Sequence, residues 1–178
     1  AARAGARTMK PIENQPRVFE ELLAEAQPIL ALAPMQDVTD LPFWKLIATY
    51  GGADVYYTEY FRVHADSTPE KRILQAISTN TTGRPVVAQM IGNDIPSLVR
   101  TARELQQYPI AGVDLNLGCP APVVYRKCAG GGLLREPQRI DSILGALRDA
   151  GYTQFTIQLV PGQEAALADW ARIAKAFA

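Results

Sequence analysis

Short apolar runs alternate with amphipathic stretches along most of the chain. Apolar runs at residues 29–33, 53–58, 85–91, 110–115 and 154–159 predict buried strands. Apolar residues recur at helical spacing in residues 39–50, 94–106, 138–150 and 162–177, with weaker helical patterns at 18–26 and 70–77. Residues 59–69 read as a loop, and residues 118–132 form a glycine-rich stretch. Strands that alternate with helices in this way are typical of βαβ units and a parallel sheet.

Two α/β architectures fit this rhythm, an open doubly wound sheet and a (β/α)8 barrel. No G-x-G-x-x-G pattern follows the first predicted strand, which disfavours a dinucleotide-binding doubly wound sheet. A full barrel needs about 250 residues. We therefore predict an α/β fold of the TIM-barrel type, incomplete, with about five βα units over residues 28–178. Residues 1–27 are expected to form an N-terminal extension with a short helix, its first ten residues a frayed tail or, as the alternative, a functional arm.

Composition narrows the class of protein further. Eighteen basic and eighteen acidic residues among 178 give a formal net charge of zero, so any nucleic-acid contact must come from a local basic patch. Two cysteines and one histidine supply neither a disulfide scaffold nor a zinc site, and no metal site is expected. No apolar run is long enough to span a membrane. These features favour a reducing, cytoplasmic setting.

Polar residues gather where the predicted strands end. They are Met35 with Gln36, Thr58 with Glu59, Gln89 within its strand, and Asn116 with Cys119. In parallel α/β folds the active site lies at this edge of the sheet.

The segment from Asp114 to Pro120 is the most informative of these strand ends. Strand alternation places Asp114 and Asn116 on one side of their strand. Asparagine is depleted in strands, so Asn116 calls for a reason. Cys119 follows on a turn, where a thiol serves as an acid, a nucleophile or an inert small apolar group; the residues alone leave these alternatives open.

Several motifs, in order along residues 29–150, resemble those of the tRNA-dihydrouridine synthases. They are Leu32-Ala33-Pro34-Met35 with Val38-Thr39-Asp40, then Thr58-Glu59, Gln89, Asn116-Leu117-Gly118-Cys119-Pro120, and Ala129-Gly130-Gly131-Gly132-Leu133-Leu134. The Asn-x-Gly-Cys-Pro segment with the later glycine-rich stretch is specific to that family. The Ala-Pro-Met of the first strand is shared more loosely with other flavin barrels.

The resemblance implies an FMN enzyme that uses NADPH to reduce particular uridines of tRNA to 5,6-dihydrouridine. It places Pro34, Met35 and Gln36 along the flavin ring, with Gln89 hydrogen-bonding to that ring. It also has Asn116 contact both the flavin and the uracil, and makes Cys119 the donor of a proton to C5. The uridine must leave the tRNA stack to reach such a pocket. A basic cluster near the barrel mouth is either a phosphate contact or a solvated surface; it comprises Arg126, Lys127, Arg135 and Arg139.

The last part of the chain departs from the family pattern. Gln158 stands where the family carries a flavin-binding lysine, and Val160 stands where it carries an arginine. With five predicted strands, we expect a second chain or a further C-terminal segment to complete the barrel. Two other functions stay open: a non-catalytic barrel relative that acts as a binding module, and another FMN barrel oxidoreductase such as a dihydroorotate-type dehydrogenase.

Overall fold

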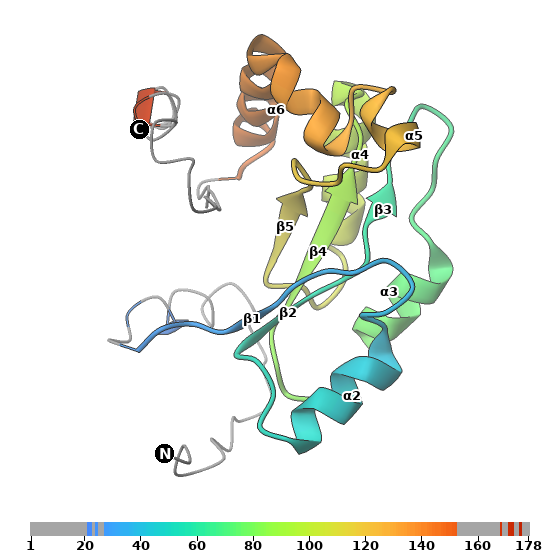
Figure 1. Cartoon of the computed structure of the whole chain (residues 1–178), viewed down its shortest axis with the longest axis vertical. Helices are drawn as coiled ribbons and strands as arrows, with labels where there is room; N and C mark the ends of the chain where they lie inside the picture. Colours follow the sequence, from blue (N-terminus) through green and yellow to red (C-terminus); the bar gives the residue numbers. More distant parts are fainter. Residues whose placement is uncertain are drawn as a thin grey trace.

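A computed structural model describes residues 27–152, together with residues 21, 22, 24, 168, 171, 172 and 175 (Figure 1). The elements, in chain order, are β1 (Ala31–Leu32), α2 (Leu41–Thr49), β2 (Val55–Tyr57), β3 (Phe61–Arg62), α3 (Lys71–Ser78), β4 (Val86–Ile91), α4 (Ile95–Leu105), β5 (Gly112–Leu115), α5 (Pro122–Tyr125), η1 (Gly130–Arg135) and α6 (Pro137–Asp149). The strand expected at 154–159 lies outside the described residues, and the helices expected at 18–26 and 162–177 lie mostly outside them. No helix among the described residues is long and apolar enough to cross a membrane.

All pairings in the sheet are parallel, and strands follow one another in chain order. β1 pairs with β2, β2 pairs with the first half of β4, and β5 pairs with the other edge of β4. A doubly wound sheet reverses its strand order at a switch point, whereas a barrel adds each strand beside the last. The described strands follow the second pattern, which confirms an α/β fold consistent with a partial TIM barrel.

One face of the sheet carries the hydrophobic core. Tyr56, Ala88 and Met90 are fully buried there. They belong to a single cluster with apolar side chains of four helices; these include Trp44 of α2, Ile77 of α3, Leu98 of α4 and Ile143 of α6. The helices α2, α3, α4 and α6 therefore cover this face of the sheet. Because side chains alternate along a strand, the residues next to Tyr56, Ala88 and Met90 in their strands point to the opposite face, here called the inner face.

The loop predicted over residues 59–69 is wrong at its start, where β3 forms. Tyr57 pairs with Val87 and Phe61 with Met90, so three residues between these pairs oppose only two on β4. β2 and β3 are thus one interrupted edge of β4, broken by a bulge-like insertion at residues 58–60. Such insertions re-aim side chains and occur next to functional sites.

The glycine-rich stretch is also more ordered than predicted, since it contains α5 and the 3-10 helix η1. Gly130 adopts φ +53°, and a Cβ atom there would lie 2.9 Å from the carbonyl oxygen of Cys119. Only glycine meets both conditions without strain. The stretch therefore packs directly against the loop that follows β5, and Figure 1 shows β4 and β5 pointing toward this part of the chain.

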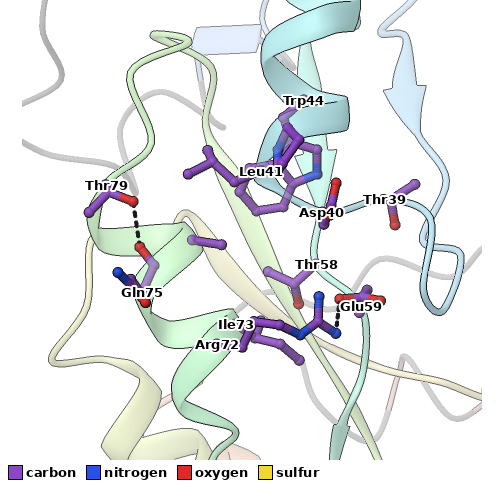
Figure 2. A pocket seen from close by; sticks show the side chains of 12 residues that line it. Thr39, Asp40, Leu41, Trp44, Thr58, Glu59, Arg72, Ile73, Gln75 and Thr79 are labelled. Atoms are coloured by element: carbon purple, nitrogen blue, oxygen red, sulfur yellow. Dashed lines mark hydrogen bonds and ion pairs between the residues drawn. The ribbon is translucent and has the colours of Figure 1, made fainter.

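A cavity of about 290 Å³ lies between α2 and α3, on the core side of the sheet (Figure 2). Its lining includes Trp44, Ile73, Thr58 and the ion pair between Glu59 and Arg72. Thr58 and Glu59, two of the strand-end polar residues picked out in the sequence, thus line it, whereas the described residues predicted to bind cofactor or substrate, and Cys119, do not.

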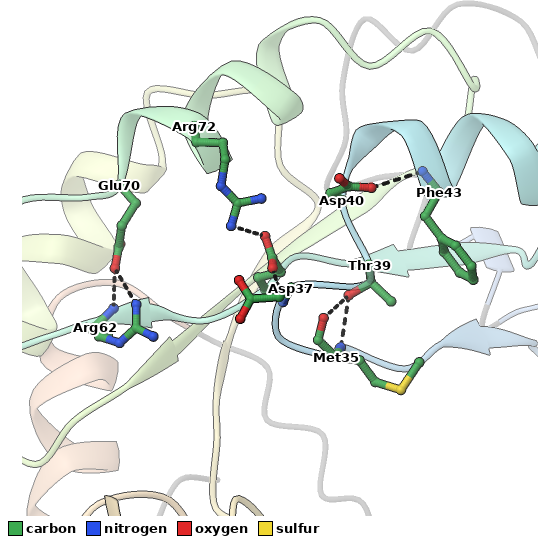
Figure 3. A network of polar contacts seen from close by, with 9 residues as sticks. Met35, Asp37, Thr39, Asp40, Phe43, Arg62, Glu70 and Arg72 are labelled. Carbon is green, nitrogen blue, oxygen red and sulfur yellow. Dashed lines mark hydrogen bonds and ion pairs between the residues drawn. The ribbon is translucent and has the colours of Figure 1, made fainter. Parts of the chain in front are cut away.

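Glu59, at the insertion, anchors the loop that follows β1. Figure 3 labels Asp37 of this loop and Arg72 of α3, the two residues that Glu59 contacts. The Glu59 side chain is 2% exposed, and it accepts a hydrogen bond from the backbone N–H of Asp37 and pairs with Arg72 at 2.6 Å. Within the same loop, Thr39 Oγ1 accepts from the N–H of Met35 at 2.9 Å and donates to its carbonyl oxygen at 3.1 Å. Asp40 caps α2 through the N–H of Phe43. The loop holding Met35 is thus fixed at both of its ends.

Arg72 and Arg62 offer a matched comparison, because both side chains are 58% exposed. Arg72→Met leaves the buried Glu59 carboxylate without its cation, so we expect a loss of about 1–3 kcal/mol in the free energy of unfolding. Arg62→Met affects a 3.7 Å pair with the 31% exposed Glu70, and we expect a loss below about 1 kcal/mol. Urea denaturation of both variants measures the difference. Equal losses would contradict the anchoring role of Glu59.

Candidate functional site

Polar side chains of β4 and β5 meet on the inner face of the sheet. Gln89 and Asp114 are register partners, and Gln89 Nε2 donates to Asp114 Oδ2 at 2.6 Å. Gln89 Oε1 in turn accepts from Asn116 Nδ2 at 2.9 Å. The backbone N–H of Gln89 donates to Thr58 Oγ1 at the insertion. The structure therefore brings together Gln89 and Asn116, which the sequence placed in one site from different strands.

Asn116 also shapes the loop that holds Cys119. Its Oδ1 accepts hydrogen bonds from the N–H groups of Gly118 at 3.0 Å and Cys119 at 2.8 Å. Such a side-chain acceptor stands in for a backbone turn partner. The carbonyl oxygen of Cys119 accepts from the N–H of Gly131 at 3.0 Å, so the loop is held from both sides. Cys119 is a free, half-buried thiol at the carboxyl end of β5.

The residues after β1 present a partly open surface. Met35 is 50% exposed, Pro34 is half-buried, and Ala31 and Ala33 are exposed. Gln36 Oε1 is buried and has no hydrogen-bond partner among the described residues. A buried, unpaired amide oxygen costs free energy unless a ligand satisfies it.

The amides of the site favour a ligand with hydrogen-bond acceptors. Each amide nitrogen carries two N–H groups, and the network uses one on Gln89 and one on Asn116. Because Asn116 is half-buried, its second N–H can meet a bound ring. These two N–H groups suit the acceptor atoms on the edge of a flavin or pyrimidine ring.

The charge of Asp114 acts within this site. Burial raises the pKa of the Asp114 carboxyl, and the hydrogen bond from Gln89 offsets part of that rise. Burial also raises the pKa of the Tyr57 hydroxyl, and the negative charge of Asp114 raises it further. Tyr57 is therefore a neighbour of the carboxylate on the inner face, contributed by β2.

The predicted basic cluster divides into two pairs. Arg135 donates to the carbonyl oxygens of Gly132 and Tyr125 and stacks over the Tyr125 ring at 4.3 Å. Arg139 donates twice to the carbonyl oxygen of Asn93. These two arginine side chains therefore hold neighbouring segments of this chain together through backbone carbonyl groups.

Arg126 and Lys127, in contrast, are exposed at the end of α5. Within the described part of the chain, neither side chain forms an ion pair or hydrogen bond. Of the four predicted cations, these two are therefore available to an outside ligand.

Sequence reasoning did not place Asp114 among the site residues, although alternation put it on the same side as Asn116. A carboxylate two residues before that asparagine, opposite Gln89, was the available signal. Gln158, predicted to contact the cofactor, lies outside the described residues.

Comparison with known proteins adds a family to this geometry. Residues 31–177 match a family profile described as dihydrouridine synthase (Dus). The chain is 35% identical over 126 residues to a tRNA-dihydrouridine(16) synthase of Neisseria meningitidis, and 32% over 127 residues to one of Ralstonia nicotianae. It is 30% identical over 127 residues to a probable tRNA-dihydrouridine synthase of Staphylococcus aureus. These matches cover 67%, 68% and 70% of the chain, but only 38%, 39% and 39% of the respective relatives.

Asp114 and Asp94 should affect stability with opposite dependence on pH. A raised pKa means that the folded chain binds the Asp114 proton more tightly than the unfolded chain, whose Asp pKa is about 3.9. Stability is then lost as pH rises from about 4 through the raised pKa. Replacing Asp114 with Asn removes this loss. The free energy of unfolding of the variant should therefore rise relative to that of wild type between pH 3 and pH 7.

Asp94 supplies the matched control. Hydrogen bonds from Ser97 lower the pKa of Asp94, so its contribution is present above about pH 4 and disappears as pH falls below that value. The free energy of unfolding of Asp94→Asn should therefore fall relative to that of wild type as pH rises from 3. Urea denaturation at a series of pH values gives both slopes, and slopes of the same sign would refute the assignment.

Proposed function

The chain belongs to the dihydrouridine synthase family, and on that premise we propose that it contributes the site for reduction of a tRNA uridine to 5,6-dihydrouridine. One observation carries the proposal: Asn116 joins the Gln89 amide to the backbone of the Cys119 loop. This arrangement lies at the carboxyl ends of β4 and β5, where parallel α/β enzymes act. Because the match covers about two fifths of each relative, activity of this chain alone is part of the proposal.

The inner face suits FMN, on which members of this family depend. Pro34, Met35 and Gln36 would lie along the flavin ring, and the unpaired oxygen of Gln36 would accept a hydrogen bond from it. Gln89 and Asn116 would donate their remaining amide N–H groups. We also propose that Gln158 completes the contacts. When bound and reduced by NADPH, FMN supplies the hydride for C6 of the uracil.

Cys119 would supply the matching proton to C5. Thiols are mostly protonated at neutral pH and serve as general acids when positioned against the reacting atom. Asn116 Oδ1 accepts from the N–H groups of Gly118 and Cys119, which fixes the Cys119 loop, and the Asn116 side chain would also contact the uracil. One hydride at C6 and one proton at C5 complete the reduction of the double bond.

The substrate must present an unstacked uridine, since a base within a helix cannot enter this site. Arg126 and Lys127 follow the Cys119 loop and are exposed, so they would contact phosphates beside the target base. Two of the three relatives described above carry position 16 in their names, and that position is the one to assay first.

A pair of cysteine variants tests this function. We expect Cys119→Ala to reduce dihydrouridine formation by about 10²- to 10⁴-fold, because only the proton donor is removed. The matched control is Cys128→Ala, which removes the other free thiol and should keep wild-type turnover. The assay incubates each protein with FMN, NADPH and unmodified tRNA and detects the mass gained by the reduced base. FMN reduction by NADPH should stay unchanged in both variants. Wild-type dihydrouridine formation by Cys119→Ala would exclude the thiol as proton donor.

A further inference from the structure

The contacts from Asp114 to Cys119 form one directional chain of hydrogen bonds. Gln89 donates to Asp114 at 2.6 Å, Asn116 donates to Gln89 at 2.9 Å, and Cys119 donates to Asn116 at 2.8 Å. At each step the donor belongs to the residue nearer the Cys119 loop. The two ends of the chain are a carboxylate, which only accepts when ionised, and backbone N–H groups, which only donate.

The side-chain amides in the middle of this series of hydrogen bonds do not themselves determine which group donates and which accepts. A side-chain amide carries an acceptor and a donor of nearly equal size, so Gln89 fits its place in either orientation. With its amide reversed, Gln89 would present N–H groups to the Asn116 nitrogen, and Asn116 would have to turn its oxygen away from the loop. Gln89 is only 5% exposed, so water cannot readily replace a lost partner. The carboxylate of Asp114, an acceptor opposite Gln89, therefore favours the observed orientation of the Gln89 amide.

We propose that Asp114 is a positioning residue, which orients Gln89 and, through Asn116, holds the Cys119 loop. The use of that loop in uridine reduction rests on the proposed function, whereas the positioning itself does not. The Asp114 side chain forms no hydrogen bond with Cys119 or with the loop backbone in the contacts described, and its hydrogen bonds reach the loop through the amides of Gln89 and Asn116.

Hydrogen exchange of the Gly118 and Cys119 amides in the full chain, without flavin or tRNA, tests this positioning. Asp114→Val removes the acceptor, and we expect exchange of these two amides to become about 2- to 10-fold faster, the range for loss of one hydrogen bond. Asp114→Asn keeps an acceptor oxygen and should stay within about twofold of wild type. The N–H of Val63, bonded to Ile91 on the far edge of β4, is the reference amide.

A double-mutant cycle separates positioning from a general structural role. In the Asn116→Ala background the two loop amides have already lost their acceptor, so adding Asp114→Val should change their exchange no further. Three results would overturn the proposal: unchanged exchange in Asp114→Val, an equal acceleration at Val63, or a full effect of Asp114→Val in the Asn116→Ala background. Since no turnover is measured, each result is independent of whether the chain reduces uridine.

Discussion

The hydrogen bond between Gln89 and Asp114 is the contact on which the site depends. Every residue of β4 is buried, and a polar side chain in such a strand is costly unless it is paired. The parallel register places Asp114 directly opposite Gln89, and Asn116 takes the remaining amide oxygen. Satisfying one buried glutamine thus orders an asparagine at the strand end, and that asparagine shapes the loop bearing the thiol.

Two further constraints bring separate loops to the same edge of the sheet. Buried Glu59 ties the segment after β1 to α3, and the extra residue between β2 and β3 is what places Glu59 there. On the other side, Gly130 and Gly131 approach the backbone of Cys119 closely. The residues proposed to bind cofactor and substrate therefore lie on loops whose backbone is held by these contacts. Such support is needed to keep a catalytic group in position.

Periodicity predicted α2, α3, α4 and α6 and the main strands well, because each of these four helices packs one apolar side into a common core, as α2 does with Trp44. The short helix α5 buries no residue and was not predicted. Motif order along the chain correctly indicated the family. β3 escaped prediction because a two-residue strand carries no periodic signal and forms only through pairing with β4. The hydrogen bonds from Arg135 and Arg139 to backbone carbonyl oxygens could not be predicted either, since the positions of these carbonyl groups depend on the folded path of the loops. Strand alternation did place Asp114 on the same side as Asn116, but the direction of the hydrogen bonds between them through Gln89 depends on the folded structure.

The most direct measurement is a titration of the full chain with FMN, followed by quenching of flavin fluorescence. We expect saturable binding by wild type, and binding weakened by about tenfold in Asn116→Leu, which loses a hydrogen bond to the ring. Asn93→Leu is the matched control, because the Asn93 side chain donates to the carbonyl oxygen of Lys127 and not to the Gln89–Asn116 network, and it should bind FMN as wild type does. Absence of saturable binding by wild type, or equal affinity in all three proteins, would contradict a flavin site built on Gln89 and Asn116.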